Sequence, residues 1–235
     1  MRLIKKTAAP ASLQKYKRDF TASYKSMDTD VKNDLLHALI AEQKGVCAYC
    51  QQLLNFTTAT IEHHCEHSIC DGTNGTTDKR LDYKNLLAVC PGKGGSPIET
   101  HCDTRKAECA GPNAIVNGLP MQLNPTTAAH IRTIVYSSTG LIKSSNTVYD
   151  REINHLLNLN TRHLKLKRKE KWLKIFRNSR SKHTNSFDKR KMKKLLEDDL
   201  ALRTVMNTNF DIPRVVTVFS NDLPGLSSYM RTKFC

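Results

Sequence analysis

Apolar residues recur at helical spacing between residues 28 and 45, in the stretch DTDVKNDLLHALIAEQKG. Val31, Leu35 and Leu39, with their neighbours Leu36 and Ile40, fall on one face of a helix. Asp28 or Asp30 can cap the start of this helix, and Gly45 can close its end. The pattern therefore predicts a helix that delivers the chain directly to the sequence VCAYC.

In the second half of the chain, the spacing of the apolar residues changes twice. Residues 130–146, HIRTIVYSSTGLIKSSN, alternate β-forming residues around a Ser-Ser-Thr-Gly turn, which predicts a short hairpin. From residue 150 the apolar spacing becomes helical, with a break expected at NLNT, residues 158–161. A further helix is expected over residues 186–206.

Residues 47–118 are rich in Cys, His, Gly and Thr and poor in long periodic segments. This composition is typical of a loop-rich unit in which a metal replaces part of the hydrophobic core. We therefore expect an α+β fold in three parts: a basic arm (residues 1–27), a metal-organised domain (28–147) and a basic helical region (148–235).

The overall composition is that of a soluble protein. Among its 235 residues, 39% are apolar, and no apolar run approaches the roughly 20 residues that span a bilayer. The basic start, MRLIKKTAAP, lacks the apolar segment of a secretory signal, so no membrane association and a cytoplasmic location are expected. A reducing compartment disfavours disulfides, so metal binding is expected of clustered cysteines, and Cys65, Cys70 and Cys109 are expected to be ordinary thiols.

The net charge of +15 points to a polyanionic partner. Fifteen Lys/Arg residues but only two acids lie between residues 160 and 194, too lopsided for a surface of paired charges. Nucleic acid is the favoured partner, although the same cations can grip a partner protein or the nucleic acid that it carries. The candidate contacts are Lys165, Lys167, Arg168, Lys169, Lys171 and Lys174.

Cys47 and Cys50 have the spacing at which two thiolates of one tight turn bind a single zinc ion. A structural site needs two more ligands, and Cys90 and Cys102 are the candidates. Eleven residues separate them, more than is usual for a second pair, so His101 or Cys109 stays open as a substitute ligand.

The stretch IEHHCEH, residues 61–67, places a carboxylate beside several imidazoles. Glu62 can hold a divalent cation while His63, whose ordinary pKa lies near neutrality, takes a proton from water. A cation at the same place stabilises the leaving oxygen of a phosphate, so the pair predicts phosphodiester hydrolysis. A structural zinc site without catalysis is the alternative, and His64 and His67 are expected to support the site rather than to bind metal.

The motifs CAYC, TIEHHCEH, LDYKNLLAVC and HCDTRKAE together resemble the HNH nuclease motif, which has a ββα-metal fold. The resemblance implies that His63 is the general base and that Glu62 and Asp103 bind a catalytic Mg or Mn ion. It also implies that Asn85 braces the loop of the base, and Lys106 stands where the family often has a lysine. Cys47, Cys50, Cys90 and Cys102 would hold the structural zinc.

The opening MRLIKK, the hairpin sequence and LLNLNTRHLKLKRK further resemble the PtuB-type HNH subunits of Septu and retron-linked anti-phage systems. This likeness implies an effector nuclease acting on DNA, or on structured RNA such as tRNA, together with an ABC-type ATPase (PtuA-like). In the retron-linked case, a reverse transcriptase and its RNA–DNA product would be further partners. The chain has no GxxxxGK[ST] sequence, so nucleotide hydrolysis would be the partner's. A non-catalytic zinc-dependent nucleic-acid-binding or adaptor subunit is the alternative.

Overall fold

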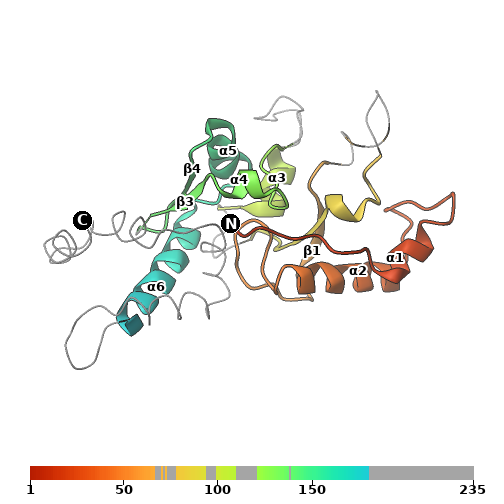
Figure 1. The fold of residues 1–235 in the computed structure, drawn as a ribbon, viewed down its shortest axis with the longest axis horizontal. Helices are drawn as coiled ribbons and strands as arrows, with labels where there is room; N and C mark the ends of the chain where they lie inside the picture. Colours follow the sequence, from red (N-terminus) through yellow and green to blue (C-terminus); the bar gives the residue numbers. More distant parts are fainter. Residues whose placement is uncertain are drawn as a thin grey trace, which may run out of the picture.

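The computed structural model describes residues 1–66, 70, 72, 78–93, 99–109, 121–137 and 139–179, with backbone only for residues 174–179. It is an α+β fold in which helices surround two small antiparallel sheets. In Figure 1, α1 and α2 lie along one side next to β1, whereas α3, α4, α5 and the second sheet form a separate group.

The first sheet pairs β1 (Thr60–His63) with β2 (Leu86–Val89), and Thr60 lies opposite Val89. It is preceded by α1 (Ala11–Tyr16) and α2 (Thr29–Glu42), and a single 3-10 turn, η1 (Tyr83–Asn85), leads into β2. Helix α3 (Cys102–Cys109) follows the sheet along the chain. The order is thus strand, strand, helix.

The predicted helix over residues 28–45 is confirmed as α2. Leu35, Leu36 and Leu39 are buried, and after Glu42 the amide of Gly45 donates to the carbonyl of Ile40 at 2.8 Å. Gly45 has a φ of 75°, a conformation that favours glycine, so the helix ends where the pattern predicts.

Strand β2 lies between two hydrophobic clusters, and all four of its residues are buried. Leu86 and Ala88 face the cluster of α1 and α2, which includes Leu13 and Leu39. Leu87 and Val89 belong to the other cluster, which contains the cysteines and the later helices. Because successive side chains of a strand point to opposite sides, one short strand holds both cores together.

The second sheet is the predicted hairpin, with β3 (Ile134–Tyr136) paired to β4 (Ile142–Ser144) and preceded by α4 (Ala128–Ile131). The later helical pattern gives α5 (Thr147–Arg151), a π-helical turn η2 (Glu152–Leu156) and α6 (Arg162–Ser179). The break falls at the expected place, where Asn158 has a positive φ of 47°. The helix expected over residues 186–206 lies outside the described residues. Among the helices that the structure describes, none is long and apolar enough to cross a membrane.

Helix α6 carries the candidate nucleic-acid contacts, and they differ in exposure. Lys167 and Lys169 are exposed, Lys165 and Lys171 are half-buried, and the side chain of Lys174 lies outside the described part of the chain. The guanidinium of Arg168 instead donates to the carbonyls of Gly140, at 2.6 Å, and Leu159, at 2.5 Å. Because these bonds hold Arg168 against the fold, its interpretation as a nucleic-acid contact is replaced by a structural role.

Arg168→Ala is expected to destabilise the fold by about 1–3 kcal/mol, because the two carbonyls lose a charged donor in a partly buried place. Lys169→Ala, on the exposed side of the same helix, is expected to change the free energy of unfolding by less than about 0.5 kcal/mol. Urea unfolding of both variants measures the difference, and equal effects would contradict the structural role of Arg168.

Candidate metal centre and hydrolytic site

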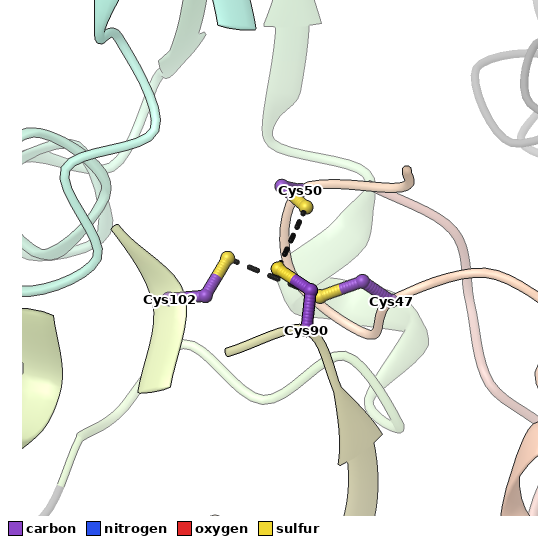
Figure 2. Close-up of side chains that lie close together, drawn as sticks. All are labelled: Cys47, Cys50, Cys90 and Cys102. Carbon is purple, nitrogen blue, oxygen red and sulfur yellow. Dashed lines mark hydrogen bonds between the residues drawn. The ribbon is translucent and has the colours of Figure 1, made fainter. Parts of the chain in front are cut away.

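Four cysteines from three parts of the fold meet with their sulfur atoms within 4.8 Å of one another. Cys47 and Cys50 belong to the tight turn after α2, Cys90 follows β2, and Cys102 begins α3. Figure 2 shows the four side chains converging from these separate segments. The predicted ligand set is therefore brought together, with Cys102 as its fourth member.

The sulfur spacing fits a tetrahedral zinc ion. The Sγ atoms of Cys50 and Cys90 are 3.6 Å apart, and those of Cys47 and Cys102 are 3.9 Å apart. Zn–S bonds of about 2.3 Å in a tetrahedron place two sulfurs about 3.8 Å apart. Cys47, Cys50 and Cys102 are buried and Cys90 is half-buried, as a closed structural site requires. The cluster is thus compatible with a structural zinc site.

The long gap between Cys90 and Cys102 is closed by a close backbone approach. Lys93 and Thr100 form an isolated antiparallel bridge, and the amide of His101 donates to the carbonyl of Gly92 at 2.9 Å. A Cβ on Gly92 would lie 1.7 Å from the carbonyl oxygen of His101. Glycine at this position therefore lets an eleven-residue insertion bring its two ends to one site.

The two candidate substitute ligands, His101 and Cys109, are not members of the cluster. His101 is buried, with Nδ1 3.2 Å from Cys102 Sγ, so the imidazole can support the sulfur by a hydrogen bond. The thiol of Cys109 lies 3.7 Å from the carbonyl of His155. Among the described residues, these four cysteines are the one group of three or more Cys, His, Asp or Glu side chains whose ligand atoms lie close enough together to share a metal ion.

Cys65 and Cys70 form a disulfide, so the expectation that both are ordinary thiols is wrong. Their Cα atoms are 6.0 Å apart, within the usual range for the bond. The carbonyl of Glu66 accepts from the amide of Cys70 at 2.9 Å, which helps to hold the two cysteines close together. The expected reducing compartment gave no indication of how close the fold brings this pair.

Glu62 lies on β1 and is buried against a buried cation. Lys106 of α3 donates to Glu62 Oε1 at 2.5 Å and to the carbonyls of His63, at 2.8 Å, and His64, at 3.1 Å. Burial raises the pKa of Glu62 to about 7; the ammonium of Lys106 opposes this shift and the carboxylate of Asp103 adds to it. Lys106 thus docks α3 on the end of β1 and lowers the cost of a buried carboxylate.

Asp103 lies in the first turn of α3, close enough to Glu62 for its carboxylate to add to the raised pKa of Glu62. The hydroxyl of Thr60 donates to Asp103 Oδ2 at 3.1 Å, which fixes the carboxylate against β1. Two neighbouring carboxylates are the oxygen ligands that a divalent cation such as Mg²⁺ prefers. Both predicted ligands of a catalytic cation therefore lie at the junction of β1 and α3.

His63 ends β1 next to Glu62 and is buried, with 7% of its surface exposed. Its Nε2 lies 2.9 Å from the carbonyl oxygen of Arg80, and its ring meets the ring of Tyr24 edge to face, with centroids 4.4 Å apart. A carbonyl only accepts, so this bond places the proton of the neutral imidazole on Nε2 and the lone pair on Nδ1. In this tautomer Nδ1 is the atom able to take up a proton.

The side chain of Asn85 joins the turn after His63 to the backbone of Lys79. Its amide nitrogen donates to the carbonyls of Cys65, at 3.0 Å, and Lys79, at 3.1 Å, while its Oδ1 accepts from the amide of Cys65 at 2.8 Å. Since Asn85 directly precedes the buried strand β2, these bonds relate the turn after His63 to the sheet. This geometry is what a residue bracing that turn requires.

His64, which follows His63 in the chain, has its own hydrogen-bond partner. Its ring lies 3.1 Å from the carbonyl of Leu123, and burial lowers its pKa to about 4, so it stays neutral. His67 lies outside the described residues. The supporting position expected for His64 agrees with these contacts.

Sequence reasoning missed Tyr24 and Arg80, which both contact His63. Tyr24 comes from the basic arm, and burial, with the nearby carboxylates of Glu62 and Asp103, raises the pKa of its phenol to about 12. Nothing in the local pattern of either residue signals this place, because the contacts join segments far apart in the chain.

Comparison with the models of known protein families and with curated proteins gives no match.

Cys90→Ser is expected to lose bound zinc, because one of four thiolates is replaced by a poor ligand. Cys109→Ser should retain it, since the Cys109 thiol contacts a carbonyl outside the cluster. Elemental analysis of the purified proteins tests this, with one zinc per chain expected for the wild type. Zinc retained at wild-type level in Cys90→Ser would contradict the proposed ligand set.

Gly92→Ala is expected to destabilise the zinc site strongly, because its Cβ would overlap the His101 carbonyl. Gly45→Ala is the matched control: Gly45 also has a positive φ, but nothing lies within 4 Å of the added Cβ, so the cost is only about 1 kcal/mol. Zinc release to a chromophoric chelator during unfolding compares the two variants. Similar release from both would mean that the close approach at Gly92 is unimportant.

Proposed function

We propose that this protein is a metal-dependent endonuclease of the HNH type. The observation that supports it best is the proximity of the Glu62 and Asp103 carboxylates at the junction of β1 and α3, with His63 next to Glu62 in β1. Two carboxylates for a divalent cation and one imidazole for a proton are the groups that phosphodiester hydrolysis needs. The strand, strand, helix order and the four sequence motifs agree with this proposal.

In the proposed reaction, Glu62 and Asp103 hold Mg or Mn, which supplies charge stabilisation to the scissile phosphate and the leaving oxygen when bound. His63 accepts the proton of the attacking water on Nδ1, because the Arg80 carbonyl keeps the other ring nitrogen protonated. The His63 ring cannot swing freely, since it is wedged against the ring of Tyr24. Asn85 positions the turn that follows His63 through its bonds to Cys65.

The exposed cations of α6 extend this proposal to substrate binding. Lys167 and Lys169 offer their ammonium groups to a phosphate backbone, an interaction that weakens as salt rises. The substrate is DNA or structured RNA such as tRNA. The likeness to PtuB-type subunits adds the proposal of an ABC-type ATPase partner, a retron reverse transcriptase with its RNA–DNA product and a role in anti-phage defence.

A second candidate function is a zinc-dependent nucleic-acid-binding or adaptor subunit without catalysis. The bond between Lys106 and Glu62 favours it, because an ammonium already satisfies one oxygen of the carboxylate that would hold the cation. In a silent protein this pair would be the permanent state, whereas in a nuclease the carboxylate shares its charge between Lys106 and the cation.

His63→Ala is expected to lower cleavage by about 10²- to 10⁴-fold, the usual contribution of a general base, while nucleic-acid affinity stays within a few-fold of wild type. His37→Ala is the matched control, because His37 is an exposed histidine of α2 that stacks on Phe56. Its cleavage should equal that of the wild type.

The measurement follows plasmid, chromosomal DNA and small RNA after induction in cells that also express the proposed partner proteins. If cleavage depends on His63, the kind of nucleic acid that is degraded identifies the substrate class in the same sample. Equal nucleic-acid integrity in wild type and His63→Ala, with both proteins folded and zinc-loaded, would favour the adaptor function.

A further inference from the structure

A cavity of about 240 Å³ lies between the basic arm and the loop before β2, and two of the residues that line it contact the candidate base. One wall comes from the arm and includes Lys17, Ser23 and Tyr24; the other includes Asp78, Arg80 and Asp82. None of these residues belongs to the cysteine cluster or to the carboxylate pair. The cavity is therefore a separate feature of the same face.

Both walls of the cavity touch His63. Tyr24 packs its ring against the imidazole from the arm, with centroids 4.4 Å apart. Arg80 accepts from Nε2 through its carbonyl, at 2.9 Å, from the other side. A group held in the cavity would therefore lie close to His63, the candidate base for the attacking water.

The lining combines cationic, acidic, hydroxyl and aromatic side chains, which suit the different parts of a nucleotide. Lys17 is exposed, and Arg80 pairs with Asp78 through two side-chain bonds, at 3.0 and 2.8 Å, with both side chains nearly half exposed, so a phosphate would compete with Asp78 for Arg80. The carboxylates and the Ser23 hydroxyl suit the donors of a base or sugar, and Tyr24 offers an aromatic surface. A surface that bound only phosphates would need only cationic side chains.

Phe20 strengthens this interpretation. It lies in the arm between Lys17 and Ala22, both of which line the cavity, and 99% of its surface is exposed. An aromatic side chain held in water is unfavourable unless something covers it, and nucleic-acid bases stack on such side chains. Lys17 and Phe20 therefore place a cation and a stacking surface on one short segment.

The size of the cavity limits what it can hold. It is smaller than the roughly 300–1,000 Å³ of pockets that enclose drug-sized ligands, so we expect it to take at most one nucleotide and not a stacked base pair. A base inside a duplex would have to leave its stack to enter, whereas a single-stranded or looped base is already available.

We propose that this cavity is a substrate subsite that binds one unpaired nucleotide next to the scissile phosphate, with Lys17 and Phe20 as its contacts and Tyr24 linking it to His63. The proposal rests on the proposed nuclease function and adds to it a preference for single-stranded or looped nucleic acid. The basic arm thereby becomes part of the substrate site.

The test measures binding without cleavage, by fluorescence anisotropy of a short labelled oligonucleotide in the absence of added divalent cations. The zinc-loaded full chain is titrated with single strands of DNA and of RNA and with the matching duplexes. The double variant Lys17→Ala/Phe20→Ala should bind single strands at least about tenfold more weakly, since stacking and a phosphate contact are both lost. Lys15→Ala, an exposed lysine of α1 outside the lining, is the control and should stay within about twofold of wild type.

Single strands should bind the wild type more tightly than duplexes, and this difference should disappear in the double variant. Equal affinity of wild type and double variant for single strands, or an equal preference for duplex in both, would overturn the subsite. A wild type that binds through the subsite but never cleaves would sink the nuclease proposal and leave the subsite intact. If cleavage depends on His63 but neither its rate nor its KM depends on Lys17 and Phe20, the subsite would be overturned and the nuclease proposal would stand.

Discussion

The four-sulfur cluster is the constraint on which the rest of the structure depends. It joins the turn after α2, the end of β2 and the start of α3, three segments that are separate in the sequence. Strand β2 begins directly after Asn85 and ends directly before Cys90, so the cluster fixes one end of a buried strand whose other end carries the brace for His63. A local metal site can thereby hold a distant turn in place.

The buried Lys106 completes this arrangement from the opposite side. Its ammonium uses the carboxylate of Glu62 and two carbonyls of the β1 end, so all three of its protons have acceptors in a place that excludes water. This triple contact sets the distance between β1 and α3 and brings Asp103 towards Glu62. The same bond places a positive charge where a cation would bind, so Lys106 and a metal ion compete for one carboxylate.

Residues close together in the sequence were the predictable part of the site. The pattern over residues 28–45 predicted α2, and the Cys-x-x-Cys spacing predicted the first two zinc ligands, because both depend on local geometry. Cys90 and Cys102 were predicted as well, from the need of a structural site for two further ligands and from the motif resemblance. Tyr24 and the inward turn of Arg168 depend on contacts across the fold and leave no local signature. The disulfide of Cys65 was missed for another reason: the reducing compartment expected from the sequence led to the prediction of free thiols.

The most direct test of the account is a crystal structure of the zinc-loaded protein soaked with Mn²⁺, with anomalous scattering recorded for both metals. The account predicts a zinc peak inside the four cysteine sulfurs and a separate manganese peak between the carboxylates of Glu62 and Asp103, with Nδ1 of His63 facing it. A zinc peak alone, with Lys106 still bonded to Glu62 and no manganese at the carboxylates, would contradict the hydrolytic site.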